Sequence, residues 1–250
     1  MENKTLKGIL EKYIEIKEER PIELSIGKFY PSSVGKCNRA IVYQMLGYPK
    51  QKPNLRTFSI LENGTYFHDR IEKMFRDSGH LIASELPFKD PELKISGRLD
   101  LIIKNPIERK LKTPIQLIGY DEQVVYEGFS EELAIVELKS ISDKGFARLT
   151  DGKEEHKDQV TLYMSHEKIY DGYLLYENKN TQELAEFYVP FDSKRAERII
   201  EKIKFCGKCF EDNVLPEKSF MRNDFECIYC DYRELCWPSE HKYNLSDLTL

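Results

Sequence analysis

The chain has 250 residues, a formal net charge of −5 and 32% charged residues. Its length suits one large domain or two small ones, and its 40% hydrophobic content supports a buried core. The negative net charge argues against a protein that coats nucleic acid through a generally basic surface, although it is compatible with local basic patches and with carboxylates that hold metal ions. No segment has the long apolar run of a membrane span, and the N-terminus lacks the apolar core of a secretion signal. We therefore expect a cytoplasmic protein without membrane contact, whose six cysteines are metal ligands or buried thiols rather than disulfides.

In chain order, the pattern predicts helices that alternate with strands, as in α/β proteins. Ser32 or Ser33 is the expected N-cap of the second helix, which carries Cys37 in its first turns and stops at Gly47. A turn at Asp90-Pro91 divides the first β region. Helices are predicted over residues 4–19, 32–46, 60–77, 154–167 and 193–211, and β structure over 81–103, 133–139, 170–176 and 184–189.

Two features concern the centre of the predicted fold. Residues 133–139 are apolar on both faces of the strand, which favours a central position in a mixed sheet flanked by helices. Residues 104–131 are more polar and contain two β-like stretches, 115–119 and 122–126. They are interpreted as a hairpin inserted between two core strands, with a role that the sequence does not define.

Acidic and basic side chains interrupt the apolar central strands. Glu137 and Lys139 are two residues apart on one strand, so their side chains project from the same face. If the strand that carries Asp100 pairs with this one, a second carboxylate joins them. Two such acids suit Mg²⁺ or Mn²⁺. Either ion polarises a phosphodiester and lowers the pKa of a bound water, and a nearby lysine stabilises the negative charge that develops on the phosphate. The alternative is a structural salt bridge, because so short a pattern recurs by chance.

Three further residues lie on predicted helices on either side of this pair of strands. His68 is on an amphipathic helix upstream, where it is either a metal ligand or an ordinary surface or core histidine. Gln159 and Tyr163 are four apart, on one face of the helix that follows the strand. Their polar groups could contact a phosphate or a base edge, or could belong to a half-buried helix face.

The cysteines form a metal-binding pattern. Cys227, Cys230 and Cys236 give Cys-x2-Cys-x5-Cys near the C-terminus, and Cys37 lies near the N-terminus. Four thiolates satisfy either a tetrahedral Zn²⁺ or an iron–sulfur cubane, and the spacing does not separate the two. Either group would join the two ends of the chain. A second Cys-x2-Cys, Cys206 and Cys209, lies in a predicted helix; Cys206 is expected to face the core, or one of the two replaces Cys37 as the fourth ligand.

Taken together, these motifs resemble the RecB-like branch of the PD-(D/E)XK nuclease superfamily over roughly residues 30–238. The resemblance is carried by the order His68, Asp100, Glu137-x-Lys139 and Gln159-x3-Tyr163, enclosed by the four terminal cysteines. It points to the iron–sulfur subgroup, which includes the fourth CRISPR-associated nuclease family (Cas-four) and AddB-type nuclease modules. The sequence departs from the superfamily pattern in placing Leu99, not proline, before the aspartate, and in its long insertion.

The resemblance implies a metal-dependent deoxyribonuclease, more often exonucleolytic on single strands or DNA ends than endonucleolytic. It assigns His68, Asp100 and Glu137 as catalytic Mg²⁺ or Mn²⁺ ligands and Lys139 as the catalytic lysine. It also assigns Gln159 and Tyr163 to DNA binding. Cys37, Cys227, Cys230 and Cys236 would hold a [4Fe–4S] cluster, which is favoured over Zn²⁺.

The expected organisation is a single nuclease domain over 1–250, with a catalytic core at 80–192 and a cluster module formed by 30–50 with 205–238. Expected partners are DNA and proteins of CRISPR integration, or of DNA repair, recombination or viral replication. The alternatives are a catalytically weak or inactive adaptor with a nuclease fold and a zinc-stapled nucleic-acid-binding protein. Arg148 is the favoured phosphate contact beyond the motifs, and the other basic candidates are Lys36, Arg39, Arg56, Arg70, Lys144 and Lys153.

Overall fold

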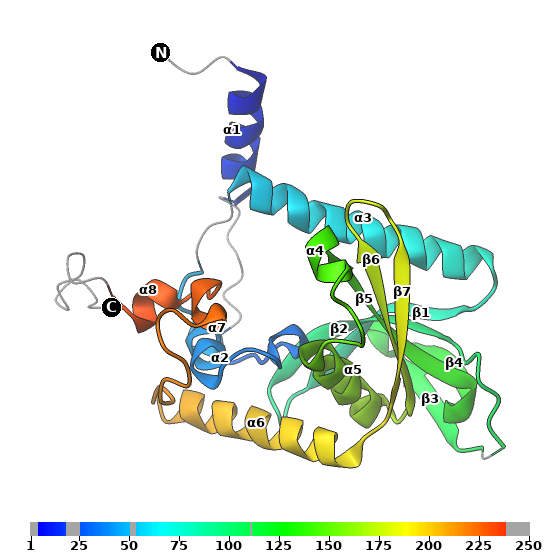
Figure 1. The fold of residues 1–250 in the computed structure, drawn as a ribbon. Coiled ribbons are helices and arrows are strands. Elements are labelled where there is room, and N and C mark those ends of the chain that lie inside the picture. Colours follow the sequence, from blue (N-terminus) through cyan, green and yellow to red (C-terminus); the bar gives the residue numbers. More distant parts are fainter. Residues whose placement is uncertain (1–4, 19–25, 51–53, 111, 239–250) are drawn as a thin grey trace.

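A mixed five-stranded sheet forms the centre of the fold in the computed structural model, which describes residues 5–18, 26–50, 54–110 and 112–238 (Figure 1). The strand order is β1-β2-β5-β6-β7; β5 and β6 run parallel, and the other neighbours are antiparallel. The strands are β1 (Leu81–Asp90), β2 (Ile95–Lys104), β5 (Leu133–Ile141), β6 (Asp171–Asn178) and β7 (Leu184–Pro190). The predicted α/β class is confirmed, and the strand that carries Glu137 is central as expected.

The insertion between β2 and β5 forms a separate two-stranded sheet. Its strands are β3 (Pro114–Ile118) and β4 (Val124–Phe129), which pair antiparallel. The short 3₁₀ helices η2 (Tyr120–Glu122) and η3 (Ser130–Glu132) follow β3 and β4, respectively. The predicted hairpin is therefore confirmed, with strand ends that differ by one to three residues from those expected.

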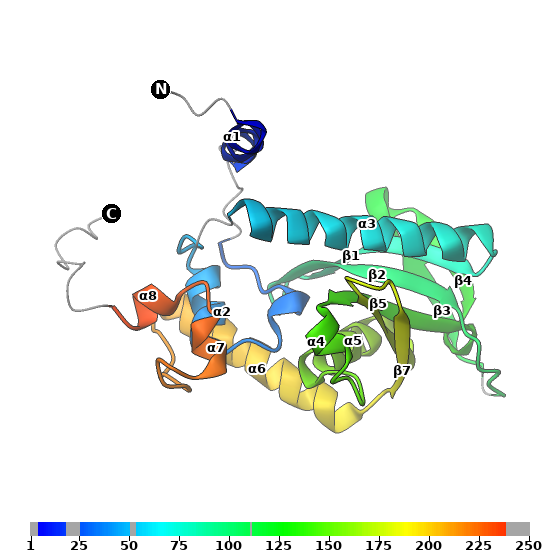
Figure 2. The same cartoon turned by 45° about the horizontal axis from the view of Figure 1, so that its top comes forward.

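Helices cover both faces of the sheet, giving three layers (Figure 2). Helix α3 (Leu55–Asp77) lies on one face, and α5 (Glu154–Glu167) and α6 (Ser193–Glu211) lie on the other. Because side chains alternate along a strand, Val136 packs with Phe67 of α3, whereas Ile135 belongs to the core cluster that includes Val160 of α5. The bounds of α5 and α6 agree with the predicted ones, while α3 begins five residues earlier, where the Asn54 side chain caps it.

The second predicted helix was wrong at its start. Helix α2 spans only Asn38–Met45, and Pro31–Ser33 forms a separate 3₁₀ helix, η1. The hydroxyl of Ser33 donates to Gln44 Oε1 at 3.1 Å inside the core, so it is not available to cap a helix. Cys37 takes the N-cap position instead of lying inside the helix, and its sulfur accepts from the backbone N–H of Ala40 at 3.4 Å.

Segments from the two ends of the chain lie side by side next to this three-layer body (Figures 1 and 2). Helix α2 packs against the segment that forms the short helices α7 (Phe225–Ile228) and α8 (Arg233–Cys236), where the rings of Tyr43 and Tyr232 have centroids 5.5 Å apart. Arg39 Nη1 also donates to the carbonyl of Pro216 at 2.7 Å. These contacts bring the segment that carries Cys37 to the segment that carries the other three candidate cysteine ligands.

Two helices complete the described chain. Helix α1 (Leu6–Glu18) buries Ile14 but exposes Leu6, Ile9, Leu10 and Tyr13. The predicted residues 4 and 19 of this helix lie outside the described ranges. Helix α4 (Asp143–Phe146) is a single turn after β5, capped by the Ser142 hydroxyl. None of the helices in the described part of the chain combines the length and the apolar character needed to cross a bilayer.

Candidate active site

The two central strands separate where the predicted acidic residues lie. The β2–β5 ladder pairs Lys104 through Leu101 with Leu133 through Val136, and the next residues are Asp100 and Glu137. Beyond this point the backbone ladder between the two strands stops. The backbone N–H of Leu138 donates instead to Asp100 Oδ2 at 2.8 Å. The side chains of both acids therefore lie where the strands diverge.

Glu137 is a buried acid with one unsatisfied oxygen. Its side chain is 1% exposed; Oε1 accepts from Lys139 Nζ, and Oε2 has no hydrogen-bond partner. Burial, together with the negative charge of Asp100, raises the pKa of Glu137 to about 7, against the opposing effect of Lys139. Burial likewise raises the pKa of Asp100 to about 6. An unpartnered buried carboxylate oxygen is costly, so this pocket favours a positively charged ligand.

Lys139 and His68 provide the nitrogen groups of the site. Burial by itself would lower the pKa of Lys139, but the charges of Glu137 and Asp100 outweigh it and raise that pKa, so the ammonium is retained. His68 on α3 has Nδ1 3.6 Å from Asp100 Oδ1. Burial lowers the pKa of His68, which keeps the imidazole neutral and leaves a ring nitrogen able to bind a metal ion.

Gln159 and Tyr163 lie behind the acids and are tied into the backbone. Gln159 Nε2 donates to Tyr163 Oη at 3.0 Å, and Tyr163 Oη donates to the carbonyl of Arg98 at 2.9 Å. Both side chains are buried, so in this structure they brace β2 as well as facing the cavity. One cavity of about 840 Å³ is lined by all six predicted motif residues, His68, Asp100, Glu137, Lys139, Gln159 and Tyr163.

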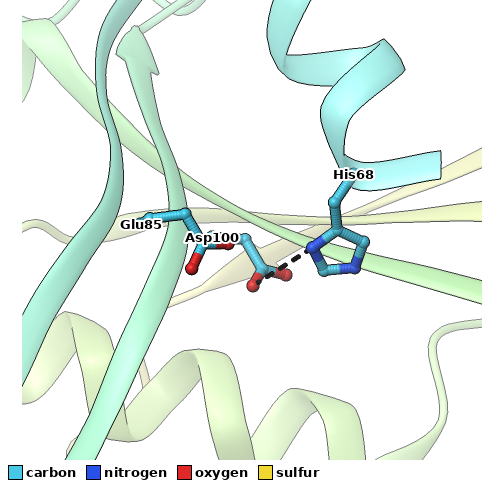
Figure 3. Close-up of side chains that lie close together, drawn as sticks. All are labelled: His68, Glu85 and Asp100. Atoms are coloured by element: carbon cyan, nitrogen blue, oxygen red, sulfur yellow. Dashed lines mark ion pairs between the residues drawn. The ribbon is translucent and has the colours of Figure 1, made fainter. Parts of the chain in front are cut away.

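Sequence reasoning missed Glu85 on β1, which lies beside His68 and Asp100 (Figure 3). Among the described residues, these three form the only set of at least three potential metal-ligating side chains whose ligand atoms all lie within 4.8 Å of one another. A signal was available in the sequence. If Asp90 pairs with Ile95 across the turn, as observed, Glu85 lies opposite Asp100 on the neighbouring strand.

The four candidate cysteine ligands line a second cavity of about 220 Å³. Cys37 comes from the start of α2, and Cys227, Cys230 and Cys236 come from the segment that forms α7 and α8. Burial raises the pKa of Cys227 and Cys230, and the neighbouring Cys37 adds to both effects. Four convergent thiols form a soft donor set that suits zinc or an iron–sulfur cluster.

The remaining predicted residues lie elsewhere. Cys206 is fully buried in the main core, as expected, and burial raises its pKa to about 12; neither it nor Cys209 lines the thiol cavity. Arg148 is exposed just beyond α4 and is not among the residues that line the large cavity. Two other basic candidates have partners within the chain: Arg39 donates to Pro216, and Arg70 pairs with Glu177.

Comparisons with known proteins support the fold. No protein-family model matches the chain, and no curated protein matches it by sequence. The crystal structure of SSO0001 is similar with a TM-score of 0.51 and 19% identity, over 92% of this chain and 94% of that one. The complex of LHK-Exo with dAMP has a TM-score of 0.51 and 11% identity, over 76% of this chain and 90% of that one. LHK-Exo, an alkaline exonuclease from Laribacter hongkongensis, also matches in a second crystal structure with a TM-score of 0.48 and 10% identity, over the same shares of the two chains. The chain therefore shares its overall fold with SSO0001 and with the alkaline exonuclease LHK-Exo.

Proposed function

We propose that the chain is a Mg²⁺- or Mn²⁺-dependent deoxyribonuclease that cleaves single-stranded DNA or DNA ends. The observation that carries the proposal is the buried Glu137, with one unpartnered oxygen, beside Asp100 and Lys139 in an open cavity. A purely structural ion pair would satisfy its oxygens within the protein. The likeness in fold to an alkaline exonuclease supports the same function.

The residues of the site have separate roles in this proposal. Asp100, Glu137 and the neutral imidazole of His68 would hold the divalent ion, since hard oxygen donors with one nitrogen suit Mg²⁺ or Mn²⁺. Such an ion, when bound, polarises the phosphodiester and lowers the pKa of a water. Lys139 keeps its proton and places a positive charge where negative charge grows on the phosphate. Tyr163 and Gln159 hold β2 in position behind these groups.

A [4Fe–4S] cluster is proposed for the thiol cavity, where it would have the structural role of joining the N- and C-terminal segments of the chain. The four thiols fit a soft metal group, because all four line one cavity. The family resemblance favours a cubane over zinc, and in a cubane each thiolate binds a different iron atom.

Nuclease assays on anaerobically purified protein test the proposal. Labelled single-stranded and duplex DNA are incubated with Mn²⁺, Mg²⁺ or EDTA, and the same sample gives a visible spectrum and an iron content. We expect metal-dependent cleavage that is lost in Lys139→Ala, with the spectrum unchanged. Lys204→Ala, at an exposed lysine on α6 outside the large cavity, is the matched control and should cleave as the wild type does. Wild-type cleavage by Lys139→Ala, or inactivity of the wild-type protein with every metal, would overturn the assignment and favour an adaptor.

A further inference from the structure

We infer that Glu85 is an additional ligand of the divalent ion, and that binding of the ion releases Arg98 to contact a DNA phosphate. The inference rests on the proposed nuclease function and adds two residues to it. Glu85 lies on β1, opposite Asp100, and its side chain points toward Asp100 and His68 (Figure 3).

The distances support a common site for these side chains. The ligand atoms of His68, Glu85 and Asp100 all lie within 4.8 Å of one another. Neighbouring ligands around an octahedral Mg²⁺ lie about 3 Å apart, so a contraction of about 1–2 Å brings the three onto one ion. An independent observation points to a cation in the same cavity, because the buried Glu137 presents there an oxygen without a hydrogen-bond partner.

The backbone of Glu85 is held in an uncommon conformation. Its φ is +51°, in the left-handed region, although it lies within a strand and is not glycine. Such a conformation is unfavourable for a residue with a Cβ atom and is maintained only where surrounding contacts impose it. Leu86 and Phe88, which follow in β1, are buried in the core and pair with β2, so the strand fixes this position.

Arg98 is the present partner of Glu85. Its Nε lies 3.0 Å from Glu85 Oε2, its side chain is 64% exposed, and it lines the large cavity. An exposed ion pair of this kind contributes little to stability, so a divalent ion competes for the carboxylate easily. The released guanidinium then stands at the cavity wall, where its fork of donors matches a phosphate.

Metal affinity tests the inference directly and without cleavage. Mn²⁺ binding is measured by calorimetry on the cluster-loaded protein in the absence of DNA. Glu85→Gln should weaken Mn²⁺ binding at least tenfold. Asp69→Asn removes the same charge from the exposed α3 wall of the cavity and should change the affinity less than twofold. Equal Mn²⁺ affinity in Glu85→Gln and the wild type would overturn the inference.

A second measurement tests the release of Arg98. Binding of a fluorescent oligonucleotide is measured with Ca²⁺, which is also a hard divalent ion, in place of Mn²⁺. Arg98→Gln should weaken oligonucleotide binding severalfold while Mn²⁺ affinity is kept or increased, because a competing cation has been removed. Unchanged oligonucleotide binding would refute the phosphate contact.

The Asp100→Asn variant distinguishes a failure of the role inferred for Glu85 from a failure of the proposed nuclease function. If Asp100→Asn loses Mn²⁺ binding and Glu85→Gln does not, the proposed metal site stands and the role of Glu85 fails. If neither variant affects binding, or the wild type binds no Mn²⁺, the proposed function itself fails.

Discussion

Replacing Glu137 with glutamine should change how the stability of the protein depends on pH. In the metal-free protein, the pKa of Glu137 rises from its ordinary value of 4.5 to about 7, mainly because the side chain is buried. The folded state therefore holds this proton more tightly than the unfolded state does. The resulting stability is fully present below pH 4.5 and is lost as the pH rises through about 7.

The size of this loss follows from the pKa values. A rise from 4.5 to about 7 corresponds to about 3 kcal/mol of unfolding free energy for a fully buried group. Glutamine has nearly the same shape and does not titrate. Between pH 4.5 and pH 8 in EDTA, the unfolding free energy of Glu137→Gln should therefore rise by about 3 kcal/mol relative to that of the wild type. This difference does not depend on which protein is more stable at either pH.

Urea unfolding followed by circular dichroism, at a series of pH values under anaerobic conditions, measures this difference. A metal ion should offset the loss of stability in the wild type at high pH, because it binds the ionised carboxylate of Glu137. At pH 8, Mn²⁺ at 100 times its dissociation constant should stabilise the wild type by about 2.7 kcal/mol and leave Glu137→Gln nearly unchanged. Parallel stability curves for the two proteins in EDTA would show that burial does not raise the pKa of Glu137.

Three further outcomes are expected. Burial lowers the pKa of His156 to about 3, so the folded state binds this proton less tightly than the unfolded state does. The stability that the neutral imidazole contributes is present above pH 6.5 and is lost as the pH falls. In urea unfolding, His156→Gln should lack this acid-induced loss. Tyr163→Phe leaves the buried Gln159 without its acceptor and should lower the unfolding free energy by about 1–3 kcal/mol in the same assay, whereas an unchanged value would argue against this hydrogen bond. Cys230→Ser should reduce iron content, visible absorbance and melting temperature together, whereas Cys209→Ser, outside the thiol cavity, should retain all three.

Patterns that depend on local chemistry were predicted well from the sequence. The bounds of α5 agree because its helix-forming run ends before Lys168, which adopts the left-handed conformation typical of a helix terminus. The central place of β5 follows from its apolar residues on both faces. Glu137 and Lys139 share a face because strand geometry requires it.

Features that depend on tertiary contacts were not predicted. Ser33 has the residue type of an N-cap, but its hydroxyl is bonded to Gln44 in the core, and this contact moves the helix start to Cys37. Glu85 was overlooked because its role follows from the residue opposite it, which requires the strand register and not composition alone. Cys37 was predicted to join the C-terminal cysteines only through the family resemblance, because the spacing of the cysteines alone does not bring these segments together.

The thiol cavity and the large cavity are connected by one short segment, residues 29–37. Phe29 forms a parallel bridge with Ile95 at the start of β2, and the following residues, including Pro31, line the large cavity. Gly97 makes this approach possible: a Cβ atom there would lie 2.7 Å from Pro31 Cδ, which explains a glycine three residues before Asp100. The segment then ends at Cys37, on the wall of the thiol cavity. A metal group held by Cys37 would therefore fix both the chain ends and one wall of the proposed active site, so its loss should reduce cleavage even where the carboxylates are intact.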